Sequence, residues 1–291
     1  MSLTVLLPVF NEELHVARCL ESVVGWADRI VVVDSFSTDR TCEIVRSFAD
    51  RGVELVQHAY EGPADQKNWA LDELGLDTEW VLFLDADEWV TPELAREIQE
   101  RCRTESEVAG FLVNRRIVFF GRWIRHGGWF PNWNLRLLRR GRGRYEQRRV
   151  HEHVQVDGPV ERLAGHLVHE DLRDLTHMIA KHNRYSNLEA AEYGEVRAGR
   201  SDGYARLFTR DPLARRRWIK TKVWLRLPCK PLLYLLWTCV FRLGFLDGAI
   251  GLRFHALQAM FKAFDQHKLW ELERTRAVPG PTGASPERKA A

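Results

Sequence analysis

The chain has 291 residues, of which 45% are hydrophobic and 29% charged, and this composition excludes a largely disordered protein. A net charge of +3 hides an asymmetry: residues 1–100 hold 21 Asp and Glu against 7 Lys and Arg, whereas residues 205–262 hold 12 Lys and Arg against 2 acids. A basic, aromatic C-terminal third is typical of a chain that meets phosphates on a membrane surface or a nucleic acid.

The cysteines and the N-terminus indicate a reducing compartment. Cys19, Cys42, Cys102, Cys229 and Cys239 are scattered and form no Cys-x-x-Cys pair, which argues against a disulfide framework and against a structural zinc site. The opening MSLTVLLPVFNEE has neither a basic n-region nor a cleavage-site pattern. We therefore expect no signal peptide and a cytoplasmic protein.

Residues 1–100 alternate apolar runs with helical patterns. We expect strands at 3–7, 30–33, 53–56 and 80–84, and helices at 13–24, around 44–48, at 63–74 and from Thr91-Pro92 onward. The apolar runs are continuous rather than alternating, as in strands that are buried on both faces of a parallel sheet. The pattern thus predicts an open α/β sheet between helices.

Beyond residue 100 the pattern changes. The short alternating segments FLVNRRIVFF, NLRLLRR and RRVHEHVQV, between residues 111 and 168, predict an antiparallel extension of the sheet. Residues 172–198 read as an amphipathic helix, and residues 215–264 as a basic, Trp-rich helical region. The uncharged run Pro231–Phe241 is 11 residues long, too short for a membrane span of about 20.

Polar residues follow the carboxyl ends of three expected strands, where ligands bind in open α/β sheets. Pro8, Asn11 and Glu12 follow the first strand, and Asp34 follows the second. A carboxylate at Asp34 suits a hydrogen bond from a nucleobase N–H, although it could instead cap the next helix. Asn11 and Glu12 line the same crevice or cap their own helix.

Asp85 and Asp87 follow the fourth strand. In extended geometry their side chains point the same way and can share one Mg²⁺ or Mn²⁺ that also binds a diphosphate. The alternative is that these acids cap the helix near Pro92 and face water. Lys67, in an acidic stretch, could reach the diphosphate; alternatively it is an ordinary surface lysine.

These motifs resemble glycosyltransferase family 2, the inverting nucleotide-sugar transferases with the GT-A fold. The matching segments are PVFNEE (8–13), VVVDSFSTDRT (31–41), DQKNWAL (65–71) and LDADE (84–88). Four further segments resemble one branch, the bacterial lipopolysaccharide-core glucosyltransferases: GRWIRHGGWFPNWNLRLLRR (121–140), VHE (150–152), HNRYSNLEA (182–190) and RLGFLDGAIGL (242–252).

The resemblance implies a GT-A sheet, mostly parallel, with an antiparallel extension and a C-terminal amphipathic helical region. Residues 1–170 would form the catalytic domain, with the nucleotide sugar on 1–100 and the acceptor side on 101–170. Residues 171–275 would meet the membrane, and 276–291 would be a disordered tail. By likeness, Asp34 contacts uracil, Asp85 the ribose or metal, and Asp87 the metal.

The implied reaction moves a hexose, most simply glucose, from a UDP-sugar donor to a lipid-anchored bacterial glycan such as a core heptose. Transfer to a lipid-phosphate carrier or a protein side chain is an alternative, as is a non-catalytic member that binds a nucleotide sugar. A dinucleotide oxidoreductase is disfavoured because PVFNEE, not G-x-G-x-x-G, follows the first strand.

Two positions depart from the family: Phe36 replaces a usual glycine, and Asn132 replaces an aspartate that is frequent in the branch. An amide cannot accept a proton, so Glu152 becomes the candidate general base. Strict alternation places Glu152 on one face with Val150 and Val154, and partial desolvation there would raise its pKa, as a base requires. A salt bridge to a nearby arginine is the alternative.

The segment His126-Gly-Gly-Trp129 predicts a loop on the acceptor side, where glycines permit close backbone approach and Trp129 offers a stacking face. His151, His153 and two later histidines lie on alternating segments without cysteine partners, which disfavours zinc.

The basic region interleaves aromatic rings with cations. Trp218, Trp224, Trp237, Phe241 and Phe245 alternate with Lys and Arg, as in amphipathic helices at a membrane interface. A soluble helical subdomain is the alternative. Nucleic acid is disfavoured because no known binding module accompanies the charge. We predict peripheral contact with an anionic membrane, at the inner face of the cytoplasmic membrane.

Overall fold

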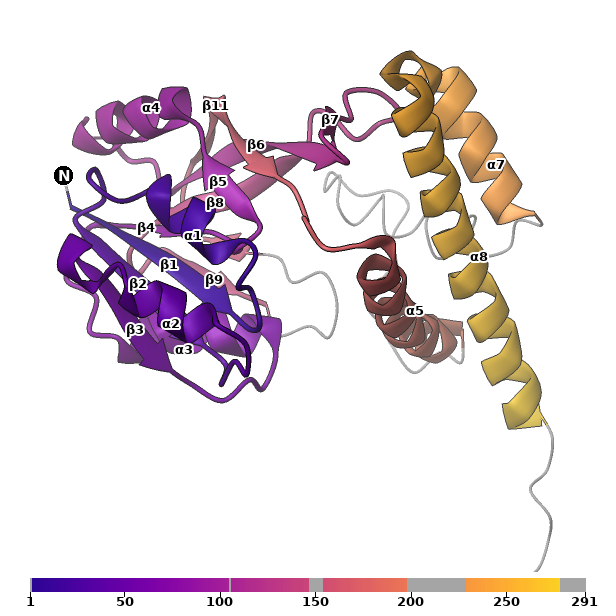
Figure 1. The fold of residues 1–291 in the computed structure, drawn as a ribbon, viewed down its shortest axis with the longest axis horizontal. Coiled ribbons are helices and arrows are strands. Elements are labelled where there is room, and N and C mark those ends of the chain that lie inside the picture. Colours follow the sequence, from indigo (N-terminus) through magenta and orange to yellow (C-terminus); the bar gives the residue numbers. More distant parts are fainter. Residues whose placement is uncertain (1, 105, 147–153, 198–228, 278–291) are drawn as a thin grey trace, which may run out of the picture. The chain divides into compact units, whose positions relative to one another are not determined.

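The computed structural model describes residues 2–104, 106–146, 154–197 and 229–277 (Figure 1). By internal contacts the chain divides into two compact units: residues up to 175 together with 236–256, and residues 176–235 together with those from 257 onward. The segment 236–256 thus packs with the N-terminal unit, although the division expected from sequence places it in the C-terminal region. The expected tail at 276–291 lies almost wholly outside the described residues.

The first unit is built on one large mixed sheet. Its parallel part has the order β3 (Val53–Gln57), β2 (Arg29–Asp34), β1 (Leu3–Val9), β4 (Trp80–Phe83). It continues through β8 (Trp133–Arg139), β6 (Gly110–Phe119), β11 (Val160–His169) and β5 (Glu88–Val90), while β7 (Arg122–Trp123) pairs with β6. The pairs β4–β8 and β8–β6 are antiparallel, as predicted, whereas β6 and β11 run parallel.

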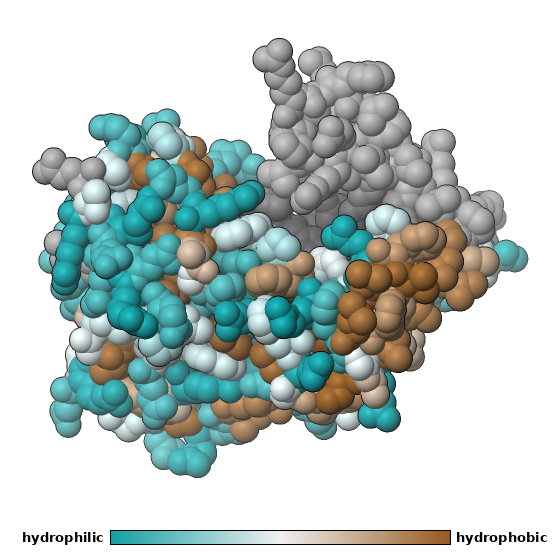
Figure 2. All heavy atoms as spheres, turned by 90° about the horizontal axis from the view of Figure 1, so that it is seen from above, coloured by the Kyte–Doolittle hydropathy of each residue, from teal (hydrophilic) through white to brown (hydrophobic). Residues whose placement is uncertain are grey.

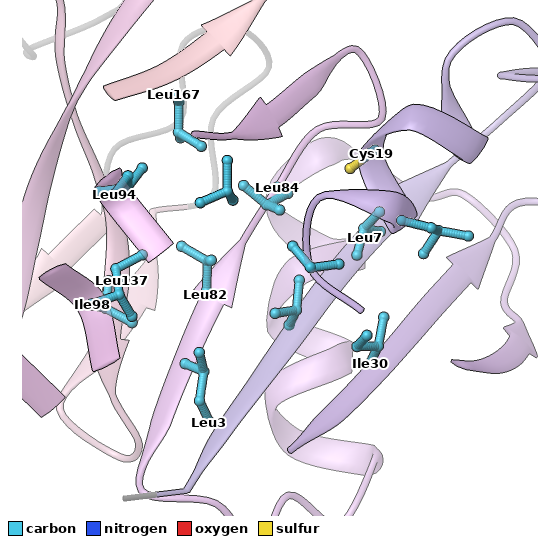
Figure 3. Packing of buried hydrophobic residues seen from close by; sticks show 14 of the residues in the cluster. Leu3, Leu7, Cys19, Ile30, Leu82, Leu84, Leu94, Ile98, Leu137 and Leu167 are labelled. Carbon is cyan, nitrogen blue, oxygen red and sulfur yellow. The ribbon is translucent and has the colours of Figure 1, made fainter. Parts of the chain in front are cut away.

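The parallel strands β1, β2 and β4 are buried on both faces, which confirms the interpretation of their continuous apolar runs, whereas the edge strand β3 is partly exposed. Leu3, Leu7 and Leu82 belong to a cluster beneath the helices α1 (Val16–Glu21), α2 (Thr41–Arg46) and α4 (Pro92–Arg103) (Figure 3). Leu6 and Phe83 belong to a second cluster, which includes residues of α3 (Pro63–Glu73). Successive side chains of a strand point to opposite faces, so each face receives its own apolar layer.

Three local expectations need correction. Among the described residues of RRVHEHVQV, Val154–Val156 form β10, which pairs with β9 (Gly143–Tyr145) in a separate two-stranded sheet. Helix α1 is shorter than the expected 13–24. The Ser22 hydroxyl donates to the Cys19 carbonyl, 2.7 Å away, and accepts from the Val90 N–H, 3.1 Å away. Such local side-chain bonds compete with helix continuation. A short 3₁₀ turn, η1 (Ala49–Arg51), follows α2.

The second unit contains most of α5 (Leu175–Arg197) and the later part of α8 (Gly248–Ala277). The rings of His182 and Phe261 stack with centroids 3.7 Å apart, and the Lys268 ammonium donates to the Asn183 carbonyl at 2.6 Å. Ala190 and Leu269 are buried together, so the two helices lie side by side.

Between these helices the described chain forms α7 (Lys230–Leu236), the π-helical turn η4 (Trp237–Phe241) and the 3₁₀ turn η5 (Gly244–Asp247). Within the described ranges, no single helix has the length and apolar character of a membrane span. One bent pair, Lys230–Phe241 with Gly244–Thr275, reaches that apolar character jointly, with an angle of 76° between its parts.

Candidate active site

The chain turns immediately after β4, at the two aspartates. The Glu88 N–H donates to the Asp85 carbonyl, 2.9 Å away, so residues 85–88 form a turn and not an extended segment. The expectation that both carboxylates point the same way is therefore wrong. Asp85 lies beside Arg136 of β8, whereas Asp87 lies beside His169 of β11.

Arg136, on β8, is buried between two carboxylates. Its guanidinium pairs with Asp85 and lies 2.7 Å from Glu88, which also accepts from Arg115 at 3.2 Å. The side chain of Glu88 is fully buried. The positive charge that the acid-rich turn requires is therefore supplied in part by the chain itself, whereas the sequence assigned it to a metal.

These contacts fix the ionisation of Asp85. Burial disfavours its charged form, but Arg136, Lys67 and Arg115 outweigh this effect and hold the pKa of Asp85 far below its usual range. Burial likewise disfavours the charged guanidinium, yet Asp85 and Glu88 raise the pKa of Arg136 well above normal. Asp85 is a carboxylate at any physiological pH.

Asp87 lies beside His169, the last residue of β11. The register of β5 with β11 pairs Glu88 with His169, and this brings the His169 Nδ1 to 3.2 Å from the Asp87 Oδ1. The nitrogen is buried but makes no hydrogen bond in the described part of the chain. Two potential ligand atoms thus lie about as far apart as neighbouring ligands of one octahedral Mg²⁺, about 3 Å.

The alternatives weighed for this segment do not hold. Thr91, and not one of the acids, caps α4, because its hydroxyl accepts from the Leu94 N–H at 3.3 Å. Lys67, on α3, is buried rather than a surface lysine. Its ammonium lies 4.9 Å from the centroid of the Tyr145 ring and acts electrostatically on Asp85.

Asp34 ends β2 and is buried at the base of a tight loop. Its carboxylate accepts from the Ser37 N–H at 3.1 Å and from the Gln57 amide at 3.0 Å. Burial opposes ionisation, but these hydrogen bonds outweigh it and lower the pKa of Asp34. It makes no cap bond to α2; the Thr41 N–H at the start of that helix donates to Asp39, 2.9 Å away.

The loops after β1 and β2 hold each other in strained conformations. Asn11 and Phe36 have left-handed φ angles of 54° and 59°. The Asn11 side chain accepts from the Thr38 N–H at 2.8 Å, and the Asn11 N–H donates to the Ser37 hydroxyl at 2.8 Å. Phe36 takes a conformation that glycine adopts without strain, and its ring is 55% exposed.

Pro8 and Glu12 frame the same region. Pro8 pairs with Val33 of β2. It does not interrupt the pairing of β1 with β4, because that pairing ends at Leu6 of β1. The Glu12 carboxylate does not cap α1. It accepts from His15 at 2.7 Å and from Arg173 at 3.3 Å, in a network that includes Asp171.

The residues expected on the acceptor side pack onto their own unit. His126 bonds through its N–H and its Nδ1 to the buried Asp247, at 2.9 and 2.7 Å. The Trp129 ring meets Phe254 edge to face, with centroids 4.9 Å apart. A Cβ at Gly127 would lie 2.0 Å from His255, so the close backbone approach is real and is made to this histidine. Glu152 lies outside the described residues.

The sequence did not identify Arg115, Arg136, Glu88 and His169 as members of the site. One signal was present: Arg136 lies in an apolar strand pattern, where a buried cation requires an acidic partner. In the described ranges no three His, Cys, Asp or Glu side chains form a group suited to a metal, so any ion here would take fewer protein ligands.

Two solved structures show a distant similarity to this chain. S. aureus TarS 1-349, solved with UDP-GlcNAc, matches at 16% identity and a TM-score of 0.47, over 95% of this chain and 91% of that one. Glucosyl-3-phosphoglycerate synthase of Mycobacterium tuberculosis, solved with Mn²⁺, UDP and phosphoglyceric acid, matches at 22% and 0.32, over 40% of this chain and 43% of that one.

Sequence relatives are more informative. The chain is 33% identical to the lipopolysaccharide core biosynthesis glycosyltransferase LpsC of Rhizobium meliloti over 207 residues, which is 70% of this chain and 75% of LpsC. The model of the family described as Glycosyl transferase family 2 matches residues 4–159. This chain therefore belongs to glycosyl transferase family 2.

Proposed function

We propose that this glycosyltransferase moves a hexose, glucose in the simplest case, from a UDP-sugar to a lipid-anchored bacterial glycan such as a heptose of the lipopolysaccharide core. The observation that carries the proposal is the placement of Asp85 and Asp87 just after β4, where the buried Lys67 acts electrostatically on Asp85. The name of LpsC, a lipopolysaccharide core biosynthesis glycosyltransferase, supports the class of acceptor.

The residues fit one divalent cation. Asp87 and His169 would hold Mg²⁺ or Mn²⁺, which usually takes few protein ligands and fills its octahedron with water and phosphate oxygens. When bound, the ion neutralises charge on the leaving diphosphate. Asp85 remains assigned to the ribose or the same ion, as the family resemblance implies, while Arg136 keeps it ionised.

The chain's own cations support the departure of the nucleotide. Lys67 is buried and fixed, so its ammonium can stabilise charge on the diphosphate without reorganising during the reaction. Asp34, Pro8, Asn11 and Glu12 would form the nucleotide side of the site. Their hydrogen bonds hold the two loops together before any ligand arrives.

Inversion requires one base to remove a proton from the acceptor hydroxyl. We assign this role to Glu152, from its place among valines in the sequence. The Glu152→Gln variant should bind UDP normally and lose at least a hundredfold in transfer, since general bases contribute about 10²–10⁴. Near-normal turnover by this variant would move the base elsewhere.

The acceptor class implies contact with the inner face of the cytoplasmic membrane. The part of the basic region that carries Trp218 and Trp224 lies outside the described residues, whereas Trp237, Phe241 and Phe245 lie within them and are exposed. Amphipathic segments of this composition bind at the headgroup level of anionic membranes.

Variants of His169 and His166, which both lie on β11, test the metal dependence. We expect UDP release from UDP-glucose to require Mn²⁺ or Mg²⁺, with His169→Ala and Asp87→Asn raising the half-saturating Mn²⁺ concentration at least tenfold. His166→Ala is the matched control and should change it less than about twofold. Calorimetry of Mn²⁺ with UDP present gives a readout that is independent of turnover.

A panel of nucleotide sugars, with and without EDTA, tests donor and metal together. If UDP release persists in EDTA, the charge on the leaving diphosphate is balanced by Lys67, Arg115 and Arg136 alone, without a metal ion. Tight UDP binding without hydrolysis or transfer to any acceptor would instead identify a non-catalytic member of the family.

A further inference from the structure

One short segment of the first unit exposes an unusual amount of apolar surface. We define the apolar tip as residues 236–246, the end of α7 with η4 and η5. Its large side chains are 48–65% exposed: Trp237, Val240, Phe241, Leu243, Phe245 and Leu246. Single exposed apolar residues are normal in soluble proteins, but contiguous ones mark an interaction surface. Hydrophobic surface gathers over one part of the molecule in Figure 2.

The turn within the apolar tip keeps an apolar residue at a strained position. Leu243 has a φ of 58°, in the left-handed region, and is exposed. Glycine or asparagine would relieve the strain there without loss of packing. An exposed leucine at this position is therefore not explained by folding stability, whereas a role in binding explains it.

The tip is fastened to the segment that follows β7. Asp247, next to the tip, accepts both bonds from His126, and the Gly127 N–H donates to the Arg242 carbonyl at 2.9 Å. Phe254 of α8 packs against Phe119, the last residue of β6, with centroids 5.2 Å apart. These contacts lie within the first unit, so the tip is part of it.

The charges around the tip have one sign. Residues 108–145 contain no Asp or Glu, and residues 236–256 contain only Asp247, which is buried on His126. The surrounding cations are exposed: Arg122, Arg125, Arg242 and Arg253. Phe120, at the turn between β6 and β7, is 61% exposed. An apolar centre with a cationic rim complements an anionic lipid surface.

We infer that the apolar tip and Phe120 form one surface that inserts into a single leaflet of an anionic bilayer. Residues 230–241 span about 18 Å as a helix, whereas the hydrocarbon core is about 30 Å thick. The 76° bend then turns the chain away from its direction of entry, so the first helix does not continue across the bilayer.

This inference deepens the proposed membrane contact and does not depend on which donor or acceptor is used. It also implies that β6 connects the membrane contact with the active site. The strand ends at Phe119 beneath the tip, and it also carries Arg115, which bonds Glu88 beside the catalytic aspartates. Lipid contact at the tip would therefore hold the active site at a fixed height above the membrane.

Flotation with vesicles tests the surface. On phosphatidylethanolamine–phosphatidylglycerol vesicles (3:1), the full chain should float, and Phe241→Ser with Phe245→Ser should lower the vesicle partition coefficient at least about tenfold. Arg122→Gln with Arg125→Gln should lower it severalfold at low salt and leave binding to pure phosphatidylcholine unchanged. Val160→Ser, an exposed apolar position on β11, is the matched control and should not alter flotation.

The unfolding midpoint and UDP release in solution show that each variant is folded and that donor chemistry is intact. Flotation of the Phe241→Ser, Phe245→Ser variant at the wild-type level would overturn the inference. So would loss of flotation from Lys220→Gln with Lys222→Gln alone, because binding would then lie in the basic region. A wild-type dimer that fails to float, and that becomes a monomer with the two serines, would identify a second copy as the occupant.

Discussion

Two regions of the first unit depart from the usual distribution of side chains in opposite ways. The charge cluster, which we define as Lys67, Asp85, Asp87, Glu88, Arg115 and Arg136, places ionised groups largely inside the protein. The apolar tip, 236–246, places large hydrophobic groups outside it. Charged residues are rarely buried unless paired, and contiguous apolar residues are rarely exposed.

The two departures have different consequences for folding. Each buried ion in the charge cluster depends on its partners, so removing one leaves another charge uncompensated. An exposed ring in the apolar tip is lost at almost no cost to stability, because it makes little contact in the folded state. Function and stability are thus coupled in the first region and separable in the second.

The largest expected effect is on the charge cluster. Arg136→Met should lower the free energy of unfolding by about 3–5 kcal/mol, because Asp85 and Glu88 lose their shared cation while Glu88 stays buried. Urea denaturation measures the change. Arg144→Met is the control: its pair with Asp72 is exposed on both sides, so its loss should change the free energy of unfolding far less. Equal losses in the two variants would break the comparison.

The next prediction compares a buried ring next to the apolar tip with an exposed ring on the tip. Phe254 is 4% exposed and packs on Phe119 and Trp129, whereas Phe241 is 65% exposed. Phe254→Ala should cost about 3 kcal/mol, and Phe241→Ala less than about 0.5 kcal/mol. Thermal unfolding in the absence of lipid compares them. A large loss from Phe241→Ala would mean that the tip is part of the core and not an interaction surface.

A smaller effect concerns pH. Burial opposes the ionisation of Asp171, but His15 and Arg173 outweigh it and hold the pKa of Asp171 far below normal. An unfolded Asp has a pKa of about 3.9, so this carboxylate stabilises the fold above about pH 4, and the contribution is lost as the pH falls below that value. Asp171→Asn should cost about 1–2 kcal/mol at pH 7 and progressively less towards pH 2. Denaturation across this range measures it, with the exposed Asp72→Asn as the control.

Much of the fold follows from local patterns that a single sequence contains. The double-sided burial of β1 and β4, the cap at Thr91 and the gathering of polar groups at strand ends all depend on neighbours within a few residues.

The missing parts depend on pairings distant in sequence. Arg136 meets Asp85, 51 residues earlier, only because the antiparallel register of β8 on β4 pairs Leu137 with Leu82. A one-residue slip would point the arginine to the other face, and no local pattern sets that register. His126 and Asp247 are 121 residues apart, so the link between the segment after β7 and the apolar tip was equally invisible. The turn at Asp85 depends on a backbone bond that the residue types do not specify.

Phe36 gives the smallest and sharpest test, because it combines an exposed ring, as in the apolar tip, with a place in the loop after β2 that we propose binds the nucleotide. Phe36 and Phe10 are both 55% exposed, but only Phe36 has a left-handed φ. Phe36→Gly should therefore raise the free energy of unfolding by about 0.5 kcal/mol through relief of strain, whereas Phe10→Gly should lower it slightly, since glycine gains freedom in the unfolded chain.

If the ring also stacks on the nucleobase, the same Phe36→Gly variant will bind UDP several times more weakly while folding more stably. Differential scanning calorimetry with a UDP titration separates the two: a gain in stability with unchanged affinity makes Phe36 only a strained loop residue, and a loss of stability contradicts the strain itself.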